Sequence, residues 1–442
     1  MKRTWMIGAL ALGLTAGTLT TGLHNHETAE ANGKHGKGTV KNVILMIPDG
    51  YSASYATNYR WYAGEEETAL DKQLTGMMRT YSANSKVTDS AAAGTAMATG
   101  VKTNNGTISM DPDGNELTSV LERASQNGKA TGLVATSTIT HATPAVFASH
   151  VASRASEAEI AKQYMDALEV DVLLGGGQKY FTAEANGGLQ KEDLIKQAKE
   201  AGYSYATNRD ELRAAKSAKL LGLFADDAMA PELDRDQTNE PSLAEMTDAA
   251  LTSLKQDQDG FFLMVEGSQI DWAGHAHDAA WAMKDSEAFH EAFKAALQFA
   301  MKDKQTLVVV AGDHDTGGMS VGGYGEYIAK PEVLRSVTAT GDFMVDAFND
   351  ELTNVEDVVE QYTSMKLTPK EAELIRSADE SKRVMTLNEI ISQRAYVGWT
   401  TTQHTGVDVP LYAYGPQQER FNGLLDNTEV PKHILQAMKL LK

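Results

Sequence analysis

Short apolar runs alternate with longer amphipathic segments along most of this chain. Seven of the runs are predicted strands: Val43–Ile47, Thr131–Ala135, Val170–Leu174, Leu220–Phe224, Phe261–Val265, Thr306–Val310 and Pro410–Tyr414. Continuous apolar strands are typical of a parallel sheet covered on both faces. Apolar residues from Phe289 to Ala300 recur at helical spacing, and Val430–Leu441 is a predicted closing helix. The pattern predicts an α/β fold with a doubly wound, mostly parallel central sheet flanked by helices.

Residues 323–400 break this alternation because they are rich in charge. Helical patterns occur around Val355–Gln361 and Pro369–Ser377, whereas Thr338–Asp342 has the composition of a loop. We therefore expect an insertion at about 323–400 that packs over the rim of one domain, residues 32–442. This insertion could shape access to a site or decorate the surface, and the sequence does not choose between the two.

The first 31 residues have the organisation of a signal peptide. Lys2 and Arg3 precede an apolar run from Trp5 to Leu14, and Ala29-Glu30-Ala31 supplies a small-x-small cleavage site. No later stretch is long and apolar enough to predict a membrane span. The sequence thus predicts a secreted protein, extracellular or associated with the cell envelope, that begins near Asn32 after cleavage.

Composition removes several classes of function. The chain of 442 residues contains no cysteine, which excludes cysteine proteases, thiolate zinc sites and dithiol redox motifs. Its formal net charge of -20 argues against nucleic acid or anionic membranes as partners. The same charge should repel phosphorylated substrates unless cations reverse the field within a site.

Metal-capable side chains follow four of the predicted strands. They are Asp49, then His141 and Thr143, then Glu266 and Asp271, and finally Asp313 and His314. Ligands of open α/β sheets bind outside the carboxyl ends of the strands, so these side chains should converge there. Asp271 and His275 are spaced i, i+4 and share a helical face. Carboxylate and imidazole are the zinc ligands that remain when thiolate is unavailable, so a metal cluster is expected.

Ser90 lies between Thr88-Asp89 and the small residues Ala91-Ala92-Ala93, where a helix should begin. Free amide groups at a helix N-terminus favour an anion, but Ser90 or Asp89 could equally serve only as a helix cap. Taken by itself, the cap is the better interpretation of this segment.

Six motifs in a fixed order extend the argument to nearly the whole chain. They are PDG at 48–50, VTDSAA at 87–92, HATP at 141–144 with SR at 153–154, EGSQID with a following histidine at 266–275, GDH at 312–314, and HTG at 404–406 followed by VPLYAYGP. With these motifs the chain resembles the alkaline phosphatases. The resemblance implies a phosphomonoesterase that acts on small phosphorylated molecules through a phosphoserine, and a homodimer is compatible with it.

The resemblance also implies a role for each matching position, at two zinc ions (Zn²⁺) and one magnesium ion (Mg²⁺). Asp271, His275 and His404 would hold one zinc ion. Asp49, Asp313 and His314 would hold the other, which the deprotonated nucleophile Ser90 would join. Asp49, Thr143 and Glu266 would hold the magnesium ion, with His141 beside them. Arg154 would grip phosphate, oriented by Asp89.

The chain differs from the well-known enteric member of that family at three places. His141 replaces an aspartate, Trp272 replaces a lysine that contacts phosphate through water, and the segment between Asp313 and His404 is longer. The first two differences concern the third metal site and the retention of phosphate, and the resemblance implies that the longer segment forms a crown or lid beside the site.

Three other functions share part of the pattern. A sulfatase would need C/S-x-P-x-R, whereas Ser90 is followed by three alanines, and phosphodiesterase action is left as a side activity. A secreted protein that scavenges metal or phosphate without turnover would explain the ligands but not Ser90 and Arg154.

The remaining histidines are assigned no function: His24, His26, His35, His150, His277, His290 and His433.

Overall fold

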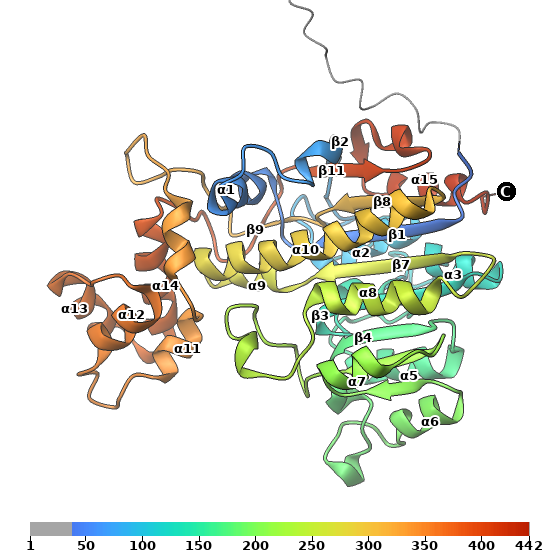
Figure 1. Ribbon diagram of the computed structural model, residues 1–442, viewed down its shortest axis with the longest axis horizontal. Helices are drawn as coiled ribbons and strands as arrows, with labels where there is room; N and C mark the ends of the chain where they lie inside the picture. The colour runs from blue at the N-terminus through green and yellow to red at the C-terminus, as the bar shows by residue number, and fades with distance from the viewer. Residues whose placement is uncertain (1–37, 442) are drawn as a thin grey trace, which may run out of the picture. The chain divides into compact units, whose positions relative to one another are not determined.

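A computed structural model describes residues 38–441, so the predicted signal peptide lies outside the described part. The centre of the fold is a ten-stranded sheet in the order β12-β2-β11-β8-β1-β7-β3-β4-β6-β5 (Figure 1). Its strands are β1 Asn42–Pro48, β2 Leu74–Arg79, β3 Ala130–Thr138, β4 Val172–Gly176, β5 Ser204–Ala206, β6 Leu220–Leu223, β7 Phe261–Gly267, β8 Thr306–Ala311, β11 Val409–Tyr414 and β12 Gly423–Asp426. Strand β11 runs antiparallel to β2 and β8, and the other pairs are parallel. The predicted mostly parallel α/β sheet is confirmed.

Alternate residues of the central strands face two separate cores. In β1, Ile44 and Met46 belong to one core, whereas Val43, Leu45 and Ile47 belong to the other. All seven residues of β1 are buried, as expected for a strand that helices cover on both faces. The continuous apolar runs in the sequence reflect this double burial.

Helices cover both faces of the sheet. One face carries α1 Ala53–Ala63, α8 Leu243–Leu254 and α10 Ala279–Asp303. The other carries α2 Ser90–Thr99, α3 Val120–Gln126, α5 Glu157–Ala167, α6 Leu194–Glu200 and α15 Glu429–Ala437. Three further helices are α4 Ala142–Ala145, α7 Arg209–Ala214 and α9 Gln269–His275. The helical spacing from Phe289 to Ala300 belongs to α10, which runs in roughly the same direction as β1, β7 and β8 in Figure 1. None of the helices within residues 38–441 is long and apolar enough to cross a bilayer.

All seven predicted strands are present, but the sequence missed the short and peripheral ones. Strand β2 is half-exposed and β5 has three residues, so neither shows a continuous apolar run. Two dipeptides, β9 Asp315–Thr316 and β10 His404–Thr405, form a separate antiparallel pair. Because they are 90 positions or so apart in the chain, no local pattern predicts their pairing.

Strands β9 and β10 flank residues 317–403 in the sequence, which are named here the helical segment. It contains α11 Gly341–Asp346, α12 Val355–Thr363, α13 Pro369–Ser377 and α14 Glu380–Arg394, which gather beside α9 in Figure 1. The two helices predicted here are present as α12 and α13. The loop expected at Thr338–Asp342 ends earlier, because Thr340 caps α11 by accepting from the Phe343 amide. An insertion is defined against relatives, so the boundary at about 323–400 stays a prediction.

Candidate active site

Four neighbouring parallel strands, β3, β7, β1 and β8, end at the same edge of the sheet. Asp49 follows β1, Glu266 is the second-last residue of β7, and Asp313 follows β8. These three carboxylates are buried, with at most 1% of each residue exposed. Burying unpaired carboxylates is costly unless protons or cations compensate them, so this edge is a site and not a random surface.

The first of two metal-capable groups consists of Asp271, His275 and His404. Their candidate ligand atoms all lie within 4.8 Å of one another. His275 Nε2 is 3.3 Å from Asp271 Oδ2, His404 Nε2 is 3.4 Å from Asp271 Oδ1, and the two Nε2 atoms are 3.1 Å apart. Three protein ligands with an open position are typical of a catalytic zinc site.

The other ring nitrogens of this group are held by the backbone. His275 Nδ1 is 2.7 Å from the Thr402 carbonyl, and His404 Nδ1 is 2.8 Å from the Thr88 carbonyl. Carbonyls only accept, so each Nδ1–H donates and each Nε2 is directed at the Asp271 carboxylate. Hydrogen bonds of this kind orient metal-ligating histidines in proteins. The donor set therefore fits a divalent cation.

The second group consists of Asp49, Asp313 and His314, all buried, whose ligand atoms again lie within 4.8 Å. His314 Nε2 is 3.1 Å from Asp313 Oδ2 and 3.6 Å from Asp49 Oδ1. The amides of Gly50 and His314 donate to Asp313 Oδ1 and fix that carboxylate. Asp49 Oδ1 and Asp313 Oδ2 have no hydrogen-bond partner, which leaves two buried oxygens directed at a common point.

The electrostatics of the two groups differ. Burial and then the negative charge of Asp313 raise the pKa of Asp49 well above its usual value. Burial likewise raises the pKa of Asp313 to about 7. Burial alone would also raise the pKa of Asp271, but hydrogen bonds with His275 and His404 hold it well below its usual value. Several buried carboxylates that lie this close together favour the binding of a cation at their centre.

Glu266 and Thr143 lie beside the second group. Thr143 Oγ1 donates to Asp49 Oδ2 at 3.2 Å, and burial raises the pKa of Glu266 to about 8. Glu266 Oε1 has no hydrogen-bond partner. Within residues 38–441, however, Glu266 and Thr143 belong to neither close group of ligand atoms. The third metal site of the sequence analysis stays a prediction.

Ser90 is the first residue of α2, and Asp89 is its cap. Asp89 Oδ1 accepts from the Ala92 amide, which leaves the Ser90 hydroxyl unengaged in capping. Ser90 Oγ lies 3.1 Å from His314 Nε2. Asp89 is therefore the helix cap of this segment, and the Ser90 hydroxyl faces the second group.

Arg154 is held in place by two side chains. Its Nη1 donates to Asp89 Oδ2 at 3.1 Å, and its Nη2 is 3.0 Å from His141 Nε2. Asp89 Oδ2 also accepts from the Gly106 amide, which fixes the carboxylate itself. The guanidinium is thus oriented while further N–H groups stay available for a ligand.

His141 contacts Arg154 and Trp272 and lies outside both close groups. Its ring meets the Trp272 ring edge-on, with centroids 5.7 Å apart. Burial and the charge of Arg154 lower the pKa of His141 to about 3, so the ring is neutral and Nε2 accepts from Arg154. His141 Nδ1 is buried without a hydrogen-bond partner. Its expected part in a third metal site stays a prediction.

The sequence analysis missed the groups that orient these ligands. Thr316 donates its hydroxyl to Asp271 Oδ1 and lies 3.3 Å from His314 Nδ1, so it contacts both groups. The sequence offered one signal for Thr316, its position two residues after His314. No sequence signal could have identified the Thr88 and Thr402 carbonyls as hydrogen-bond acceptors, because every residue carries a carbonyl.

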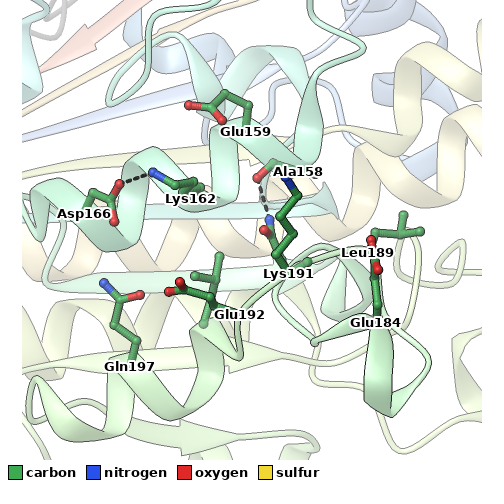
Figure 2. A pocket seen from close by; sticks show the side chains of 11 residues that line it. Ala158, Glu159, Lys162, Asp166, Glu184, Leu189, Lys191, Glu192 and Gln197 are labelled. Atoms are coloured by element: carbon green, nitrogen blue, oxygen red, sulfur yellow. Dashed lines mark hydrogen bonds and ion pairs between the residues drawn. The ribbon is translucent and has the colours of Figure 1, made fainter.

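A separate hollow lies between α5 and residues 184–197 (Figure 2). Its lining includes both signs of charge, and Lys162 pairs with Asp166 one turn further along α5, on one side of the hollow. It contains none of the residues described above. The strand-end site is therefore the better candidate for chemistry.

Comparison with known proteins agrees with this geometry. The model of the alkaline phosphatase family matches residues 40–440. Alkaline phosphatase 3 of Bacillus subtilis (strain 168) is 44% identical over 442 residues, covering 96% of this chain and 94% of that protein. The crystal structure of Thermus thermophilus alkaline phosphatase has a TM-score of 0.84 at 30% identity and covers 96% of both chains. A histidine-to-glutamate mutant of TAB5 alkaline phosphatase, with magnesium bound in its M3 site, has a TM-score of 0.68 at 29% identity over 91% of this chain and 99% of that one.

Proposed function

This chain belongs to the alkaline phosphatase family of metal-dependent phosphomonoesterases, and we propose that it hydrolyses its substrates through Ser90. The observation that carries the proposal is the place of the Ser90 hydroxyl. It lies 3.1 Å from a candidate ligand atom of the second group and at the N-terminus of α2. A hydroxyl beside a cation site is where a serine nucleophile is activated.

The two close groups would hold the catalytic metals, which we propose are zinc. Asp271, His275 and His404 would bind one ion. Asp49, Asp313 and His314 would bind the other. Bound there, the metals would stabilise an ionised serine and neutralise the charge of a phosphate group.

The protein's own groups supply attack and orientation. Ser90 Oγ forms a bond to phosphorus while the bond from phosphorus to the alcohol oxygen breaks, which gives phosphoserine and the alcohol. Water then cleaves the phosphoserine and releases inorganic phosphate. Arg154, held by Asp89 and His141, donates to two phosphate oxygens with the planar fork that lysine lacks. The first amides of α2 add donors directed at the same anion.

We propose that Asp49, Thr143 and Glu266 hold a third ion, magnesium, with His141 at its edge. The unpartnered Glu266 Oε1 and the contact of Thr143 with Asp49 support this set. Imidazole is a poor magnesium ligand compared with carboxylate, so His141 should weaken the site. The TAB5 mutant that gained a glutamate and holds magnesium in M3 agrees with that reasoning.

The Ser90→Ala variant tests the nucleophile. It should lose at least about 1,000-fold in the rate of phosphate release from a monoester while it keeps its zinc content. Ser286→Ala is the matched control, because Ser286 is equally buried but its hydroxyl only donates to Ala282 O within α10. Full activity of Ser90→Ala would rule out Ser90 as the nucleophile. If the unmodified enzyme hydrolysed a phosphate diester as fast as a monoester, the proposed substrate class would be wrong.

We further propose that the chain is exported after cleavage near Asn32, which the leader pattern of residues 1–31 supports. Sequencing the N-terminus of the protein recovered from a culture medium would test this. The homodimer suggested by the family stays a prediction that light scattering can check.

A further inference from the structure

His277 lies just beyond the first metal group, in the turn that follows α9. It is buried, and its backbone adopts φ of 51°, a conformation that non-glycine residues seldom hold without support. The ring stacks on the Trp399 ring, with centroids 5.1 Å apart and planes 2° from parallel. A buried, stacked histidine in a strained turn is held there by more than one contact.

The ring of His277 connects to the loop that carries the other half of the first group. Its Nε2 donates to the Thr401 carbonyl at 2.9 Å. The next carbonyl, that of Thr402, accepts from His275 Nδ1, and His404 follows two residues later. His277 therefore holds the backbone segment that orients one ligand and bears another.

The helical segment also contacts this turn through one of its helices. Its α14 provides Asn388, which donates to the Ala276 carbonyl at 2.9 Å, and Ser392, which donates to the His277 carbonyl at 2.8 Å. Glu389 Oε1 lies 3.1 Å from His277 Nδ1. The side chain of His277 is thus the point where α14, the turn after α9 and the 399–404 loop meet.

We propose that His277 is a positioning residue for the first metal group, and that through it the helical segment stabilises bound zinc. The inference rests on the proposed function, because it requires His275 and His404 to be zinc ligands. His275 needs this support: a third of its side chain is exposed, at 33%, so packing alone does not fix the ring. Without the His277 hydrogen bond, the Thr401 carbonyl loses its side-chain donor, and the neighbouring Thr402 carbonyl directs His275 Nε2 at Asp271 less firmly.

Three variants of the full chain separate positioning from general stability. His277→Phe keeps a ring to stack on Trp399 but has no donor for Thr401. His277→Gln keeps a donor at a similar distance along the side chain. Arg376→Gln is the control, because it breaks contacts with Glu356 and the Leu352 carbonyl inside the helical segment, away from the turn.

The measurement is the rate at which zinc leaves the zinc-loaded enzyme for a chromogenic chelator, followed together with the melting temperature. Replacing groups that orient metal ligands typically costs 10- to 100-fold in metal affinity, and we expect about 10-fold faster loss of one zinc ion from His277→Phe. His277→Gln should stay within about 3-fold of the unmodified enzyme. Arg376→Gln should melt earlier and release zinc at the unmodified rate.

Zinc loss from His277→Phe at the unmodified rate would overturn the inference, as would an equal acceleration in Arg376→Gln. If His277→Phe does not fold, Trp399→Leu removes the surface that orients the ring, and zinc must then leave it faster. If the unmodified chain takes up no zinc, the proposed function itself fails, which is a different outcome from a zinc enzyme that tolerates His277→Phe.

Discussion

Replacing Trp272 by lysine should make the enzyme bind inorganic phosphate more tightly. Trp272 sits in α9 directly after Asp271, and its ring meets His141 edge-on at 5.7 Å. His141 in turn lies 3.0 Å from Arg154, the proposed phosphate clamp. A lysine ammonium at position 272 would therefore add a positive charge beside the phosphate, where this chain has an uncharged ring.

The size of the effect follows from Coulomb's law. An ammonium about 7 Å from one phosphate charge gains about 0.6 kcal/mol in water and about 2.4 kcal/mol at an effective dielectric constant of about 20. Trp272 is only half-buried, and Arg154 repels the new ammonium, so a value of about 1 kcal/mol is reasonable. That corresponds to about a 5-fold lower inhibition constant for phosphate.

The assay is competitive inhibition by inorganic phosphate in steady-state hydrolysis of a monoester. Trp272→Met is the control, because methionine removes the ring without adding charge. The gain of Trp272→Lys over Trp272→Met should shrink in about 1 M salt, where the Debye length falls to about 3 Å. Equal inhibition constants for the lysine and methionine variants would refute the electrostatic reasoning.

Two further predictions concern neighbouring residues. Arg154→Lys should lower kcat/KM by about 100-fold. A single ammonium cannot keep the contacts with Asp89 and His141 and also bind two phosphate oxygens. A loss below about 3-fold would contradict this reasoning. Burial, the largest single effect, lowers the pKa of His150. Its 2.7 Å hydrogen bond with Glu122, its contact with the Ser109 carbonyl and the charge of Glu122 together outweigh burial and raise the pKa to about 9. The pair should thus stabilise the fold fully below pH 6.5, and lose about 1 to 2 kcal/mol, after solvent screening, as the pH rises through about 9. Urea unfolding of His150→Gln should differ from the unmodified protein near pH 6 and converge near pH 10, and a constant difference would exclude the linkage.

Much of the fold was predictable because its signals are local. The seven predicted strands are the buried ones, whose apolar runs follow from cover on both faces. The short pair β9–β10 was not predictable, because two dipeptides bear no periodicity. Helices α12 and α13 were found from their own spacing, whereas α11 was not predicted, and its first two residues fell in the loop expected at Thr338–Asp342.

The site divides in the same way. Strand ends and i, i+4 spacing already grouped Asp49, Asp271, His275 and Asp313, because residues close in sequence or at one sheet edge have little freedom to separate. The metal role that the sequence suggests for His141 stays a prediction, and the structure adds the contacts of its ring with Arg154 and Trp272.

By itself, therefore, the sequence determined the strands, the kinds of ligand and their order along the chain. Only the tertiary structure decided which groups meet across long separations. His404 reaches His275 from 129 residues away, and the Thr88 carbonyl orients His404 from 316 residues away. His277, assigned no function from the sequence, contacts both Trp399 and Thr401. Such contacts depend on the path of the backbone, and backbone carbonyls are identical at every position, so no residue type in the sequence marks them.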